Sequence, residues 1–116
     1  MNVGALMTRI LLLTSALALL LPACSSTLAV SGQMMDGSES FTGSATGYLD
    51  GAGTVELVTN KGVKCTGSFV YVTRRNGSGT FSCANGESGP FSFVSTGQRG
   101  TGTGTIGGRP VTFTFG

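Results

Sequence analysis

Apolar and hydroxyl side chains alternate along the second half of the chain, and this period of two constrains the fold more than any other feature. The apolar residues fall on odd positions: Cys65, Phe69, Tyr71, Phe81, Cys83, Phe91, Phe93, Val111, Phe113 and Phe115. Even positions are largely Thr and Ser, and Val70 and Val72 are among the exceptions. Because successive side chains of a β-strand point to opposite faces, the pattern predicts strands with one apolar face and one hydroxyl-bearing face.

Glycine divides the strand-like text into short segments. The chain has 20 glycines among 116 residues, and glycine is costly inside a helix but favourable in tight turns. We count about seven short strands. Their expected ranges are Phe41–Leu49, Thr54–Thr59, Val63–Thr73, Gly79–Ala84, Pro90–Thr96, Thr101–Ile106 and Pro110–Phe115. We therefore predict an all-β domain, a small antiparallel meander that forms a curled sheet or a small barrel.

Cys65 and Cys83 lie on the apolar side of their strands, as a disulfide between neighbouring strands requires. The segment Arg74–Gly77 between them has the Asn-Gly signal of a hairpin tip. A two-residue turn at that point would not place the two cysteines directly opposite each other. The sequence therefore predicts the disulfide, and leaves open whether a bulge near Gly77-Ser78-Gly79 or a longer loop sets its register.

The first 23 residues have the three parts of a bacterial export signal. Arg9 supplies a positive charge, and residues 10–21 form an apolar run whose length, about twelve residues, suits a signal peptide better than a membrane span. The motif Leu21-Pro22-Ala23-Cys24 that follows resembles the lipobox of bacterial lipoproteins. It departs from the usual pattern at Pro22. An ordinary signal peptide cleaved after Ala29 is the alternative.

The lipobox resemblance implies that Cys24 is the first mature residue and that its acylated form anchors the chain in the bilayer. In that family, a residue other than Asp after the cysteine directs the protein to the outer membrane, and Ser25 stands here. The protein would then lie in the cell envelope, at the periplasmic face of the outer membrane. The chain has three cysteines, and either cleavage site leaves Cys65 and Cys83 as one pair.

The sequence divides into three parts. Residues 1–23 are predicted to be the signal peptide, residues 24–40 the lipidated N-terminus with a flexible tether, and residues 41–116 the glycine-rich β domain. The tether is expected because its small polar residues show no sustained period.

A weak repeat recurs about every 24 residues in the β domain. Its units begin at Phe41, Cys65 and Gly89, and each is followed by a Gly-x-Gly-Thr. Residues 65–89 resemble MORN repeats, which are glycine-rich β-hairpin modules, although Cys65 stands where those repeats have an aromatic residue. The resemblance implies a curved antiparallel meander that contacts proteins or lipids, with no catalytic residues to carry over.

Few residues are suited to catalysis or to cofactor binding. The chain has no His and only five acidic residues, so imidazole-based nucleophile pairs and imidazole metal sites are excluded. The acids are scattered, although folding can bring two carboxylates together. Gly102–Gly107 matches a dinucleotide fingerprint, but a Phe-alternating strand follows it instead of a helix. We expect a strand with a glycine face there, approached closely by a backbone or a large aromatic ring. We predict no enzyme activity, cofactor or metal.

The net charge of +2 is too small to indicate a nucleic-acid partner. Arg74 and Arg75, at the predicted hairpin tip, are the best candidates for contact with an anionic surface. We therefore expect a non-enzymatic envelope lipoprotein that presents a small β binding or structural domain to an envelope protein or glycan. The alternative is a periplasmic inhibitor of a lytic enzyme such as lysozyme.

Overall fold

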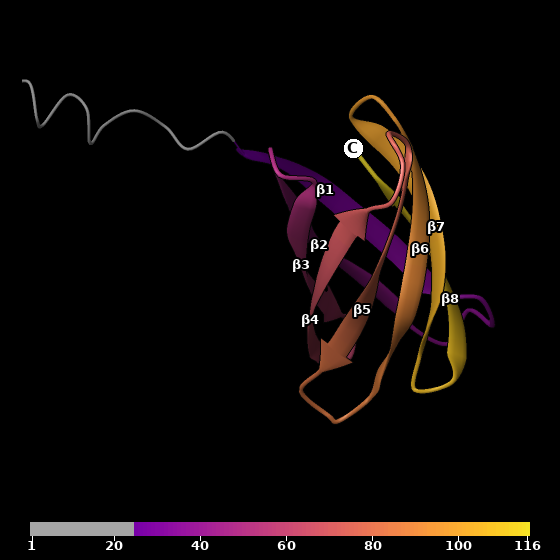
Figure 1. The fold of residues 1–116 in the computed structure, drawn as a ribbon. Helices are drawn as coiled ribbons and strands as arrows, with labels where there is room; N and C mark the ends of the chain where they lie inside the picture. The colour runs from indigo at the N-terminus through magenta and orange to yellow at the C-terminus, as the bar shows by residue number, and fades with distance from the viewer. Residues whose placement is uncertain (1–24) are drawn as a thin grey trace, which may run out of the picture.

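The computed structural model describes residues 25–116, which form one closed barrel of eight strands (Figure 1). The strands are β1 (Ser25–Met34), β2 (Ser40–Tyr48), β3 (Ala52–Thr59), β4 (Lys64–Tyr71), β5 (Asn76–Cys83), β6 (Ser88–Thr96), β7 (Arg99–Ile106) and β8 (Arg109–Phe115). The predicted signal peptide and Cys24 lie outside the described residues. No helix among residues 25–116 is long and apolar enough to cross a bilayer.

Each strand pairs antiparallel with the next strand along the chain, and β1 pairs with β8 to close the barrel. The closing register joins Val30 to Phe115 and Met34 to Val111. The predicted all-β antiparallel fold is thus confirmed, in its small-barrel form. The three repeat units correspond to successive hairpins, β2–β3, β4–β5 and β6–β7, and closure of the barrel buries the apolar face that they share.

The prediction of a flexible tether before residue 41 is wrong for residues 25–40. Residues 25–34 form β1, which pairs with β2 along its length and with β8 over its second half. Its inward-facing apolar residues are Leu28, Val30 and Met34, but Ser26 and Gly32 interrupt the series. Gly32 faces the ring of Phe41, its partner on β2, so that position needs no side chain of its own. Residues 25–34 are therefore part of the barrel wall, which has eight strands among residues 25–116.

The inward face combines large aromatic rings with glycines on the neighbouring strand. Phe69 lies opposite Gly53, and Phe93 lies opposite Gly77. A Cβ at either glycine would collide with the ring beside it. Because a small barrel has little internal space, this pairing lets rings that come from adjacent strands share one layer. The predicted glycine face of β7 follows the same rule, since the ring of Phe113 covers Gly102.

The predicted disulfide joins Cys65 on β4 to Cys83 on β5, with the two Cα atoms 3.9 Å apart. The two residues are direct cross-strand partners. The longer-loop alternative produces this register, because residues 72–75 form the connection and Asn76 and Gly77 belong to β5. The expected Asn-Gly hairpin tip is therefore wrong. The Val72 amide donates to the Asn76 carbonyl across the loop at 2.8 Å, so the connection is centred on Arg74 and not on the Asn76-Gly77 pair.

Candidate functional site: an apolar cavity at the mouth of the barrel

The two ends of the barrel differ in how tightly they are filled. At one end, which we call the closed end, large side chains are almost completely buried: Met34, Phe41, Leu57, Cys65, Ile106 and Val111. The other end, the mouth, carries the beginning of β1, the C-terminus of β8 and the connections β2–β3, β4–β5 and β6–β7 (Figure 1). The interior is therefore sealed on one side and accessible from the other.

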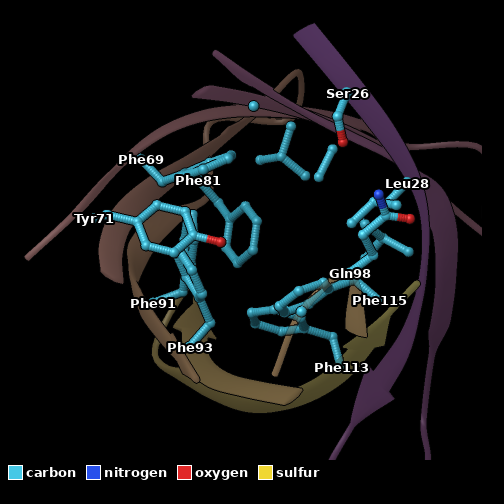
Figure 2. A pocket seen from close by; sticks show the side chains of 15 residues that line it. Ser26, Leu28, Phe69, Tyr71, Phe81, Phe91, Phe93, Gln98, Phe113 and Phe115 are labelled. Carbon is cyan, nitrogen blue, oxygen red and sulfur yellow. The ribbon is translucent and has the colours of Figure 1, made fainter. Parts of the chain in front are cut away.

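A cavity of about 140 Å³ lies inside the barrel on the mouth side. Figure 2 shows side chains from around the barrel pointing into this space. The lining is mainly apolar and consists of Leu28, Val30, Ala45, Gly47, Val55, Phe69, Tyr71, Phe81, Phe91, Phe93, Gly97, Phe113 and Phe115, with Ser26 and Gln98 as polar members. An apolar cavity of about 150 Å³ can stay dry and take up a ligand the size of benzene, so this volume suits a small apolar molecule or part of a larger one.

The aromatic rings around the cavity hold one another in place. The ring centroids of Phe93 lie 5.3 Å from Phe69, 5.2 Å from Tyr71 and 5.8 Å from Phe115, all in edge-to-face geometry. Such contacts are favourable beyond the area that they bury. The cavity wall is therefore preorganised, which lowers the entropic cost of binding a ligand.

Hydrogen bonding fixes Tyr71 at the mouth. Its hydroxyl donates to the Ser95 hydroxyl at 3.3 Å, and Ser95 donates to the Arg75 carbonyl at 3.3 Å. The Ser95 amide also donates to that carbonyl, at 2.7 Å. The Tyr71 ring is thereby held against the cavity while the β4–β5 loop is tied to β6, so the loop and the cavity wall are mechanically connected.

The predicted site residues lie at opposite ends of the barrel. Arg74 and Arg75 are exposed on the β4–β5 loop at the mouth, and their contact with an anionic surface stays a prediction. Cys65 and Cys83 lie on the closed-end side of the barrel, away from the mouth. Cys24 is outside the described residues, but its neighbour Ser25 begins β1 at the mouth.

A charged cluster covers the closed end. The Arg109 guanidinium binds Glu39 at 3.2 Å and Glu87 at 2.9 Å, and Lys61 lies 3.9 Å from Glu39. A hydrogen bond with the Thr59 side chain, together with Arg109, lowers the pKa of Glu39, and the bond to Glu39 raises the pKa of Arg109. Arg109 thus brings two of the scattered acids together and compensates their charge. This arrangement stabilises the β1–β2, β5–β6 and β7–β8 connections against one another.

No protein-family model matches the chain, and the comparison with curated proteins gives no match. Two solved structures resemble it. A de novo designed fluorescence-activating β-barrel aligns with a TM-score of 0.61 and 13% identity over 78% of this chain and 89% of its own. The redesigned barrel mFAP1, solved bound to DFHBI, aligns with a TM-score of 0.61 and 15% identity over 84% of this chain and 95% of its own. At such low identity the likeness concerns the fold alone.

The cavity itself was not predicted from the sequence. Its aromatic residues were correctly placed on one apolar face, but how completely that face is filled was not predicted. A signal was present in the glycines at 47 and 97, which leave space at the mouth where a side chain would otherwise stand. Alternation alone does not tell a filled interior from a partly empty one, because both need the same apolar residues.

Proposed function

We propose that this protein is a non-enzymatic lipoprotein of the cell envelope, anchored through acylated Cys24, whose barrel binds a small apolar ligand. The observation that carries the ligand-binding part is the preformed apolar cavity at the mouth. Concave, largely apolar sites with a few polar groups are the usual form of small-molecule sites. The hydroxyl-rich outer wall is left as the surface for an envelope protein or glycan partner.

The chemistry of the lining defines the ligand class. Seven aromatic rings and several aliphatic side chains face the cavity, whereas the Tyr71 hydroxyl is already bonded to Ser95. A ligand therefore gains mainly from leaving water, by about 25 cal/mol for each Å² of apolar surface buried. The similar barrel mFAP1 was solved with DFHBI bound, which supports the view that a barrel of this architecture accommodates a small molecule. We favour an uncharged, flat or flexible apolar compound.

A titration with the apolar dye N-phenyl-1-naphthylamine tests the proposal. A soluble form beginning at Ser25 is suitable because residues 25–116 contain all eight strands. We expect saturable binding with one dye per barrel. Gly47→Leu should abolish it, since Gly47 lines the cavity and no atom lies within 4 Å of a Cβ placed there. The added side chain therefore enters the ligand's space from a position that has room for its Cβ.

Val58→Leu is the matched control, because Val58 is exposed on the outer wall. It adds apolar volume outside the cavity and should leave dye binding unchanged. Equal dye binding by the wild type and Gly47→Leu, with both proteins folded by circular dichroism, would show that the dye sits elsewhere and would overturn the cavity as the site.

A further inference from the structure

The exposed large apolar residues of the barrel gather at the mouth. Among residues 25–116 there are eight of them, and all except Met35 and Val58 lie in the last three residues of β2, β4 or β6 or in the loop that follows. Leu49 in the β2–β3 loop is 84% exposed, and Val72 in the β4–β5 loop is 71% exposed. The other four are Tyr48, Val70, Tyr71 and Val94. Exposed apolar side chains concentrated on one face mark a surface that contacts a partner or a membrane.

The charge at the mouth is positive. Three arginines lie at this end: Arg74 and Arg75 on the β4–β5 loop, and Arg99 at the start of β7. Asp50, on the β2–β3 loop, is the acidic residue at the same end. The carboxylates of Glu39 and Glu87 are at the closed end, bound to Arg109. Apolar tips beside arginines are suited to the interface of a bilayer that contains anionic lipid, where the tips enter the headgroup region and the guanidinium groups meet phosphates.

The covalent connection leads to the same end of the barrel. Ser25 begins β1 at the mouth and pairs with Tyr48, the neighbour of Leu49. Consecutive Cα atoms are about 3.8 Å apart, so an acylated Cys24 cannot be far from the mouth. Ser25, the residue next to Cys24 in the sequence, is already part of β1. This step rests on the anchoring proposed above.

We infer that the mouth of the barrel lies against an anionic phospholipid bilayer. Leu49 and Val72 enter its interface, Arg74 and Arg75 contact lipid phosphates, and the cavity opens toward the membrane. The lipid anchor and the mouth are then two contacts with the same surface, which fix the orientation of the barrel as well as its location. The closed end, with its ion pairs, faces away from the membrane.

Intrinsic tyrosine fluorescence reports on this contact directly. The chain has two tyrosines and no tryptophan, and both tyrosines, Tyr48 and Tyr71, lie at the mouth. The processed full-length protein is reconstituted into vesicles of phosphatidylcholine and phosphatidylglycerol whose acyl chains carry bromine near the headgroup. We expect bromine to quench the tyrosine emission at least twofold relative to unbrominated vesicles. Flotation of the same vesicles measures anchoring independently.

Paired variants separate docking from other effects. Leu49→Glu with Val72→Glu should abolish the quenching, whereas Met35→Glu with Val58→Glu adds the same charge at exposed apolar positions away from the mouth and should preserve it. Arg74→Gln and Arg75→Gln should each lower the equilibrium constant for docking of the mouth on the bilayer by about fivefold. Lys64→Gln, exposed at the start of β4 on the closed-end side, is their control.

The outcomes distinguish the anchor from the mouth contact. Flotation with quenching supports both. Flotation without quenching overturns the mouth contact and leaves the anchor intact. Quenching by a processed protein that mass spectrometry shows to carry no acyl group on Cys24 supports the mouth contact and overturns the anchor. Absence of both, or equal quenching in the Leu49/Val72 and Met35/Val58 variants, overturns the inference.

Discussion

The phenyl ring of Phe113 on β8 lies over Gly102, the residue directly opposite on β7, and fills the space that a side chain at position 102 would need. The same relationship joins Phe69 to Gly53 and Phe93 to Gly77. Glycine weakens a strand because it has no side chain to pack, and an aromatic ring across the ladder restores the lost contact. In this barrel the glycines and the rings therefore act as pairs.

Gly102→Ala is expected to destabilise the barrel by about 1–3 kcal/mol, the usual cost of overpacking a well-packed interior. A Cβ there would lie 2.7 Å from the Ser92 carbonyl oxygen as well as against the Phe113 ring. Gly47→Ala is the matched control, since a Cβ at that inward position has no atom within 4 Å. It should be neutral or stabilising, by up to about 1 kcal/mol. Urea unfolding of the two variants measures the difference, and equal stabilities would contradict the pairing rule.

Replacement of Cys65 and Cys83 by Ala should cost about 3 kcal/mol, as the loop-closure entropy of a bridge spanning 18 residues predicts. Urea unfolding with and without reductant checks the value. Reductant should lower the stability of the wild type to near that of the variant and leave the variant unchanged. A reductant effect of the same size on both proteins would show that the disulfide is not its cause.

Stability should fall in acid through Glu39. The Thr59 hydrogen bond and Arg109 lower the pKa of Glu39 in the folded protein, so the unfolded chain takes up the proton first as the pH falls. The ionised Glu39 carboxylate therefore contributes its full stabilisation of the folded state above about pH 4.5, the ordinary pKa of a glutamate. This stabilisation is lost as the pH falls through the lower pKa of Glu39 in the folded protein. Glu39→Gln should be less stable than the wild type at neutral pH, and this difference should shrink below pH 4.5.

Glu56→Gln is the control for this titration, because Glu56 is exposed on the outer wall of β3. The free energy of unfolding of the Glu56→Gln variant, measured by urea unfolding at each pH, should change with pH in the same way as that of the wild type. A Glu39→Gln curve that stays parallel to the wild type down to strongly acid pH would contradict the role assigned to the Glu39 carboxylate.

Mass spectrometry of the mature protein should find acyl groups on Cys24 and two fewer hydrogens than the reduced chain, because Cys65 and Cys83 form a disulfide. Cys24→Ser should abolish the acylation and release the protein from the membrane fraction on washing with salt. An unmodified mature terminus at Val30 would show cleavage after Ala29 instead. That outcome would also remove the first half of β1, whose residues Ser26 and Leu28 line the cavity.

Local sequence pattern was sufficient to find seven of the strands and to assign the buried face of four of them. The odd-numbered apolar series in β4, β5, β6 and β8 was assigned to the buried face, and Cys65 and Cys83 were paired on it. These predictions held because strand geometry repeats every two residues, so each strand's own side chains record which face is buried. The strand that was not predicted, β1, has a weaker alternation of apolar residues, because Ser26 and Gly32 occupy inward positions.

Closure and the cavity were decided by the tertiary structure. The pairing of Val30 with Phe115 joins the two ends of the described chain, and no local pattern specifies a partner so distant in sequence. The same closure turns an apolar sheet face into an enclosed space and brings Leu49, Val72 and Arg74 to one rim beside Ser25. The alternation of side chains thus determined which residues face inward, whereas ring closure determined that they surround a cavity, because enclosure depends on how all eight strands meet.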